Sequence, residues 1–187
     1  MMLTISKTVL LSAMLFQAKA DVRYYLNGIC FAPDKKLYST DGHRAFIGEH
    51  ETDGLNDQVI VAIKGAKPTR FDKAEIDTDT GYVSYFDVHG LRIGAGLCEV
   101  IDGRFPDIER LTSTFESKPT NEIGFNAGYL ADIEKAAKLY NPEFCGIKIK
   151  PNGNTEASIV EFNSGFSNGT LIIMPMRIRG GMGHEHC

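Results

Sequence analysis

One order of secondary structure occurs twice in this sequence, and it constrains the fold more than any other feature. Short apolar runs and one helical stretch predict the order β-α-β-β-β over residues 1–50, and the same order returns over residues 121–178. Residues 58–100 between them add further strands, with at most one helical turn at 63–72 because Gly65 and Pro68 interrupt it. We therefore expect an α+β fold of repeated β-α-β-β-β half-domains, with antiparallel sheets and two main helices.

Several local predictions follow from the same residues. Helices are expected from Ser6 to about Lys19 and from Asn126 to about Tyr140, each beginning at a residue able to cap it. Residues 23–31 and 122–125 are predicted to be strands. In residues 91–100, apolar side chains recur at every second position and predict a strand with one buried face: Leu91, Ile93, Ala95 and Leu97.

Composition narrows the classes of function. The chain has 187 residues, of which 43% are hydrophobic and 24% charged, which is enough to bury a sizeable core. A formal net charge of -4 argues against a protein that holds nucleic acid by bulk basicity, although it leaves room for a local basic surface. The cysteines are widely spaced and form no CxxC pair, which is typical of reduced thiols in a cytoplasm: Cys30, Cys98, Cys145 and Cys187.

The N-terminal apolar run supports two interpretations. Residues 8–16 are followed by Ala18-Lys19-Ala20, which is the layout of a secretory signal peptide with an A-x-A cleavage site. The same run fits a buried helix, because Val9, Ala13 and Phe16 share one helical face. It is too short to span a bilayer, so we expect no membrane partner.

We find no pattern that indicates catalysis or a cofactor. A Gly-rich phosphate loop, HExxH, a GxSxG elbow and paired-cysteine zinc spacing are all missing from the sequence. His184, His186 and Cys187 are metal-binding residue types, but the glycine-rich stretch 179–187 is predicted to be a disordered tail. We expect a protein that is not an enzyme and that uses no metal.

The segment Ser39-Thr40-Asp41-Gly42-His43-Arg44 combines turn residues with side chains suited to a binding site. Gly42 permits a positive φ angle, and Asp41 can hydrogen-bond to the backbone two residues ahead, so a tight hairpin turn is predicted. A solvated hairpin and a functional turn both fit this composition.

Four segments, read in order, resemble the bacterial DNA polymerase III beta sliding clamp family. They are residues 21–28 (DVRYYLNG), 40–44 (TDGHR), 102–107 (DGRFPD) and 174–177 (MPMR). Residues 122–126 (EIGFN) and the helix after them are also similar to the clamp's last half-domain. The resemblance implies a DNA-clamp-like fold. It also favours a helix over a signal peptide at the N-terminus, because a helix immediately precedes the DVRYYLNG strand in the family.

The resemblance suggests how the chain is divided. Residues 1–111 look like the middle domain of the family, with its second helix reduced or lost, and 112–120 form a linker. Residues 121–178 look like the second half of the last domain, before the tail 179–187. Family clamps have three domains and close as a dimer through the first and last. We therefore expect that this chain cannot close a ring in that way.

In the family, polymerases, clamp-loader subunits and repair proteins insert a short hydrophobic linear motif between the middle and last domains. Matched position by position, that partner-peptide pocket would here be lined by Leu26, Thr40, Gly42, His43, Arg44, Pro106, Arg110, Leu111, Met174, Pro175, Met176 and Arg177. Ala45 replaces a larger apolar residue of the family and Leu111 replaces a usual Val, so the pocket volume would differ.

Contact with double-stranded DNA is implied for a second set of residues: Arg23, Tyr24, Tyr25, Lys7 and Lys19. Because so few cations lie on the two expected helices, any DNA binding should be weak and strongly dependent on salt or on assembly.

The resulting hypothesis is a cytoplasmic processivity factor of DNA replication that assembles as a homo-oligomer around DNA, of use to a small replicon such as a phage or plasmid. The alternative is a clamp mimic or decoy that captures replication proteins without encircling DNA. A secreted α/β protein is a third interpretation, and it rests only on the first twenty residues.

Overall fold

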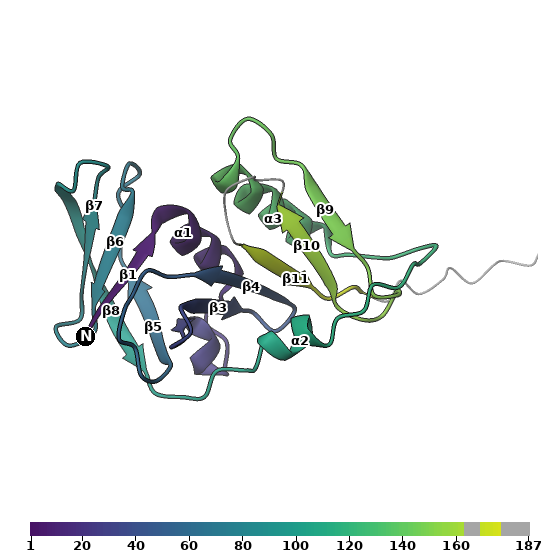
Figure 1. Cartoon of the computed structure of the whole chain (residues 1–187), viewed down its shortest axis with the longest axis horizontal. Coiled ribbons are helices and arrows are strands. Elements are labelled where there is room, and N and C mark those ends of the chain that lie inside the picture. Colours follow the sequence, from purple (N-terminus) through teal and green to yellow (C-terminus); the bar gives the residue numbers. More distant parts are fainter. Residues whose placement is uncertain (163–168, 177–187) are drawn as a thin grey trace, which may run out of the picture.

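The computed structural model describes residues 1–162 and 169–176, which form a single antiparallel sheet with helices on it (Figure 1). The helices are α1 (Lys7–Phe16), the 3-10 helix η1 (Tyr24–Asn27), α2 (Glu109–Ser113) and α3 (Ala127–Tyr140). The strands are β1 (Met2–Ser6), β2 (Ile29–Phe31), β3 (Lys36–Thr40), β4 (Arg44–Glu49), β5 (Val59–Lys64), β6 (Lys73–Asp77), β7 (Tyr82–Phe86), β8 (Arg92–Ile101), β9 (Ile147–Lys150), β10 (Ser158–Phe162) and β11 (Thr170–Ile173).

The order of strands across the sheet places β11 beside β4, which belongs to the first fifty residues. It runs β1-β6-β7-β8-β5-β2-β3-β4-β11-β10-β9, with every neighbouring pair antiparallel. The junction is the pair β4 and β11, where Phe46 lies opposite Leu171 and Ala45 lies opposite Ile172. The expected α+β fold with two main helices is thus confirmed, and it forms one continuous sheet in the described part of the chain.

The main core lies on the face of the sheet that α1 and α3 cover. Phe16 of α1 stacks on Phe46 of β4 with ring centroids 6.1 Å apart. Ile133 of α3 is fully buried in the same cluster, as are strand residues from both ends of the sheet, such as Ile5 and Leu171. Burial of this continuous apolar surface contributes most of the free energy that holds residues 1–111 against residues 121–162 and 169–176.

A second, smaller core lies on the opposite face of the sheet. Neighbouring residues of a strand point to opposite faces, so Cys30, Ile60 and Ile172 point away from the main core. They are covered by Leu26 of η1 and by Phe105. This second core places η1 and residues 102–111 over the junction of β4 and β11.

The two main helices begin and end for different local reasons. At α3, the Asn126 side chain accepts a hydrogen bond from the Gly128 backbone N–H at 2.8 Å, and Asn141-Pro142 ends the helix. At α1, Ser6 occupies the N-cap position but makes no side-chain cap hydrogen bond, and the helix ends at Phe16 rather than near Lys19. No helix in the described residues has the length and apolar character needed to cross a membrane.

Two predicted strands are wrong in detail. Residues 24–27 form η1, so the strand predicted over 23–31 is limited to β2. Residues 122–125 contribute only one isolated bridge, between Gly124 and Met176. Residues 63–72 contain no helix, which agrees with the prediction of at most one helical turn there, and α2 includes residues 112 and 113 of the expected linker.

The buried face predicted for β8 is the exposed one. Leu97 lies opposite Tyr82, and the two side chains are 56% and 57% exposed. The inward positions of β8 are Gly94 and Gly96, because Gly94 lies opposite the buried Tyr85. The apolar alternation along β8 therefore marks the solvent side of the sheet.

Candidate functional site

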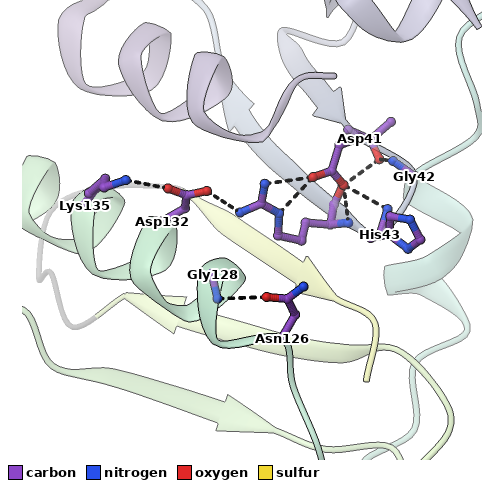
Figure 2. Close-up of polar contacts among 9 residues, drawn as sticks. Asp41, Gly42, His43, Asn126, Gly128, Asp132 and Lys135 are labelled. Carbon is purple, nitrogen blue, oxygen red and sulfur yellow. Dashed lines mark hydrogen bonds and ion pairs between the residues drawn. The ribbon is translucent and has the colours of Figure 1, made fainter. Parts of the chain in front are cut away.

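The turn between β3 and β4 is rigid because its polar side chains bond to its own backbone (Figure 2). Asp41 Oδ1 accepts hydrogen bonds from the backbone N–H groups of His43 at 2.9 Å and Arg44 at 2.8 Å. Thr40 Oγ1 donates to the Arg44 carbonyl at 2.6 Å. Gly42 has φ +89°, a backbone conformation that favours glycine, and a Cβ atom there would lie 2.8 Å from Arg23 Nη2, so the Arg23 side chain would have to move.

Arg44 is held in a buried position between charges and rings. Its side chain is 8% exposed, and its guanidinium carbon lies 4.4 Å from the centre of the Tyr129 ring and 5.3 Å from that of Phe16. Nη2 and Nε bond to Asp41 Oδ2 at 2.8 and 3.0 Å, and Nη1 bonds to Asp132 Oδ2 at 2.8 Å. Burial opposes the charge, but the hydrogen bonds to Asp132 and Asp41 outweigh it and raise the pKa of Arg44.

A cavity of about 230 Å³ lies beside this turn, at the junction of β4 and β11. It includes eight of the residues assigned to the partner-peptide pocket: Leu26, Thr40, Gly42, His43, Arg44, Pro106, Leu111 and Met174. Arg110, Pro175 and Met176 do not line it, and Arg177 lies outside the described residues. Met176 instead pairs with Gly124, whose carbonyl accepts its N–H at 2.8 Å.

The cavity is also lined by Ala45, which was expected to change the pocket volume, and by four residues that were not assigned to the pocket: Arg23, Tyr25, Ile108 and Ile172. Arg23 and Tyr25 were assigned to DNA. Ile172 meets Ala45 only because β4 pairs with β11, and no local pattern shows that pairing. Ile108 carried a usable signal, since it lies between Pro106 and Leu111, which were both assigned to the pocket.

The chemistry of the cavity suits an apolar side chain. Its floor is formed by Leu26, Ala45 and Ile172, all buried, and Met174 stands at the rim with 37% of its surface exposed. His43 stacks on Tyr129 at a centroid distance of 6.0 Å and forms a polar wall with Arg44. An apolar floor with a few fixed polar groups is the usual composition of a site that binds a short peptide.

A second cavity of about 540 Å³ adjoins the first and shares Tyr25, Pro106 and Ile108 with it. Its lining includes Cys30, whose thiol Sγ lies 3.8 Å from Gln58 Oε1. Burial raises the pKa of Cys30 to about 12, so this thiol is protonated and unreactive at neutral pH.

The residues assigned to DNA do not form one surface. Lys7 Nζ donates to the Thr69 carbonyl at 2.7 Å at the start of α1, whereas Lys19 and Tyr24 line a separate cavity beyond its end. Arg23 pairs with Asp21 at 2.8 Å, and that side-chain hydrogen bond lowers the pKa of Asp21 to about 2. Arg23 and Tyr25 therefore line the cavity beside the turn between β3 and β4, and Lys7, Lys19 and Tyr24 lie outside it.

The described ranges contain no group of His, Cys, Asp and Glu side chains that could hold a metal ion. His184, His186 and Cys187 lie outside these ranges.

Comparison with known proteins gives a consistent result for sequence and fold. No protein-family model matches the chain. The beta sliding clamp of Vibrio cholerae is 31% identical over 141 residues, which cover 71% of this chain and 37% of that protein. The beta sliding clamp of Pseudomonas putida is 30% identical over 145 residues, which cover 71% of this chain and 38% of that protein. The chain thus spans less than two fifths of the length of these curated relatives.

Solved structures extend the likeness in fold to almost the whole chain. The DnaN sliding clamp of Pseudomonas aeruginosa bound to griselimycin has a TM-score of 0.58 and 17% identity, covering 95% of this chain and 66% of that one. The DnaN clamp of Bartonella birtlesii bound to griselimycin has a TM-score of 0.60 and 18% identity, with 95% and 66% covered. In sequence and in fold, this chain is therefore a relative of the beta sliding clamps, the beta subunits of bacterial DNA polymerase III.

Proposed function

We propose that the chain is a sliding-clamp-like accessory protein of DNA replication, which binds short hydrophobic motifs of DNA polymerase and clamp-loader subunits. The observation that carries the proposal is the cavity at the junction of β4 and β11. It joins all four segments that resemble the clamp family, through residues such as Leu26, Pro106 and Met174. It combines an apolar floor with the polar residues of the turn between β3 and β4, a composition suited to peptide capture. In this role the protein has no catalytic residues.

The decisive experiment is a titration with a fluorescein-labelled peptide that carries the hydrophobic clamp-binding motif of a bacterial DNA polymerase III catalytic subunit. Wild type should bind it, and His43→Ala combined with Met174→Ala should lose about tenfold or more in affinity. Met2→Ala is the matched control, because Met2 is 49% exposed on β1 and lies outside the cavity. Absence of binding by the wild type would falsify the proposal.

Griselimycin provides a second probe, because it is bound by the clamps of Pseudomonas aeruginosa and Bartonella birtlesii. We expect it to compete with the labelled peptide. Binding of griselimycin without competition would place its site elsewhere on the chain and count against a shared cavity.

A processivity factor must also remain on DNA, which the sliding clamps of the family do by encircling it. We propose a homo-oligomer that encircles DNA. Light scattering gives the state of assembly, and retention on circular but not linearised duplex DNA tests encirclement. A monomer at working concentration contradicts a ring.

The charges on the helices favour a second candidate, a clamp mimic that captures replication proteins without encircling DNA. On α3, Lys135 bonds to Asp132 at 2.8 Å and Lys138 bonds to Glu134 at 2.5 Å, so both lysines are already paired. α1 carries a single cation, Lys7. Such a surface attracts phosphates weakly. Peptide binding by a protein that is not retained on circular DNA would support the mimic.

A further inference from the structure

We propose that the second cavity binds a lysine or arginine side chain of the same partner peptide, next to the hydrophobic motif that occupies the first cavity. This inference rests on the proposed function and deepens it, because it adds a basic residue to the motif that the chain would recognise. The second cavity measures about 540 Å³ and shares Tyr25, Pro106 and Ile108 with the first. One continuous peptide can therefore reach both.

Strand β3 relates the two cavities to each other in distance and direction. Tyr38 of this strand lines the second cavity, and Thr40 lines the first. Side chains two positions apart on a strand point to the same face, about 7 Å from each other. Since an extended peptide has the same spacing, its apolar anchor can occupy the first cavity while a side chain about two to four residues away enters the second.

The buried part of the second cavity suits the stem of a long side chain. Phe105 and Ile108 are each 6% exposed there, and Tyr38 is 9% exposed. Lysine and arginine pack their methylene groups on such apolar surfaces while the charged end stays at the edge. A cation is also attracted to aromatic rings, and Tyr25, Tyr38 and Phe105 all line this cavity.

The carboxylates of the lining can hold the charged end. Asp107 and Glu109 line the cavity together with one guanidinium, that of Arg104. Lys36, which is not part of the lining, already bonds to Glu109. Asp107 Oδ1 accepts the Arg110 N–H at 3.1 Å, whereas Oδ2 bonds to no other described residue. Asp107 therefore keeps acceptor capacity for an ammonium or guanidinium group.

The hydroxyl of Tyr38 is a second group available to a cation. Tyr38 is a buried residue, yet its hydroxyl bonds to no other residue in the described part of the chain. Burial raises the pKa of Tyr38, and so do three nearby carboxylates, those of Asp34, Glu109 and Asp107. The hydroxyl is therefore neutral at physiological pH and lies in a negative field. An N–H group of a bound cation would satisfy its oxygen.

The test measures affinity for labelled motif peptides in which one lysine stands about two to four residues before or after the apolar anchor. Matched peptides carry glutamine in place of that lysine. At least one lysine peptide should bind the wild type about three- to tenfold more tightly than its glutamine match. The advantage should shrink as salt is added, because the charges lie at the edge of the cavity. If no lysine peptide binds more tightly than its match, the inference is overturned.

Two conservative variants locate the effect. Asp107→Asn keeps the oxygen that accepts the Arg110 N–H but removes the charge, and Tyr38→Phe removes only the hydroxyl. Neither side chain lines the first cavity, so both variants should bind the glutamine peptides as the wild type does and lose most of the lysine advantage. Asp102→Asn, the same change of charge outside both cavities, is the control and should keep the advantage. An advantage that survives in both variants overturns the assignment to the second cavity.

The glutamine peptides separate this inference from the proposed function. If the wild type binds them but gains nothing from lysine, the motif cavity stands and the second site fails. If the lysine peptides bind and His43→Ala combined with Met174→Ala weakens none of them, the first cavity fails and the second site remains. Absence of binding by every peptide overturns both.

Discussion

Pro68 lies directly against Gly94, so that a Cβ atom on Gly94 would overlap Pro68 Cγ, lying closer to it than two carbon atoms in van der Waals contact. The contact shows how the loop of residues 65–72 covers the inner face of the sheet. Gly96, the next residue of β8 on the same face, is also close to its neighbours, since a Cβ atom there would lie 3.3 Å from the Lys64 carbonyl oxygen. The loop lies against the backbone of β8 because no inward side chain separates them.

Gly94→Ala should therefore destabilise the protein by about 1–3 kcal/mol, because the added methyl group overpacks this contact. Alanine's smaller unfolded-state entropy offsets about 0.4–1 kcal/mol of that cost, so the net effect remains unfavourable. Urea denaturation gives the free energy of unfolding. Ala95→Ser, at an exposed position of the same strand, is the control and should change stability little. A Gly94→Ala variant as stable as wild type contradicts the close contact.

His50 should make the stability depend on pH. Its buried ring bonds through Nε2 to the Ala32 carbonyl at 2.9 Å and accepts the Thr52 N–H at Nδ1, at 3.2 Å. Protonation of Nδ1 would break the hydrogen bond with Thr52, because Nδ1 could then no longer accept the Thr52 N–H. Burial, partly offset by the Ala32 hydrogen bond, lowers the pKa of His50.

As a consequence, the unfolded chain takes up a proton below the ordinary histidine pKa of about 6.5, while the folded chain stays neutral to lower pH. Since the unfolded state then binds more protons, the free energy of unfolding should fall as the pH drops below about 6.5. Urea titrations between about pH 5 and 7.5 measure this dependence. His50→Gln should have a shallower dependence, and identical slopes for both proteins would refute the assignment.

Leu171→Ala should lower the stability of the whole described chain by about 2–5 kcal/mol, because Leu171 is fully buried in the core that both segments share. Native-state hydrogen exchange followed by mass spectrometry can report residues 1–111 and 121–176 separately. We expect faster exchange in both. Acceleration confined to 121–176 would mean that the two segments are independent domains. Leu97→Ala, on the exposed face of β8, should leave both unchanged.

The cysteines should differ in reactivity by position. Cys145 is exposed, whereas burial raises the pKa of Cys30 to about 12. Iodoacetamide at about pH 8 should alkylate Cys145 quickly and Cys30 only after unfolding. Peptide mapping by mass spectrometry distinguishes the sites. Comparable rates for Cys30 and Cys145 in the folded protein would show that Cys30 is accessible.

The sequence predicted most elements of the fold, because hydrophobic period and capping residues act locally. Asn126 capped α3 as expected. The wrong face of β8 has a specific cause: the rule assumes that large apolar residues face the core, but here Gly94 and Gly96 face it so that the loop carrying Pro68 can approach. Only the packing of that loop reveals the exception.

The candidate site was predictable to the extent that its residues lie in short motifs. His43 and Pro106 belong to such segments, and both line the cavity. Ile172 does not stand out, because its meeting with Ala45 depends on the register of β4 against β11. The contact between Asp132 and Arg44 could not be predicted either, because it depends on how α3 packs against the turn between β3 and β4.

The pairing of β4 with β11 also determines when the cavity can exist during synthesis. Strands β1 to β8 lie within the first 101 residues and can pair as the ribosome delivers them. Ile172 and Met174 close the cavity from the last strand of the described chain. Closing so long a loop is slow compared with forming a hairpin. A nascent chain can therefore hold most of its sheet before the cavity exists, and the partner capture that we propose would require β11 to be in place.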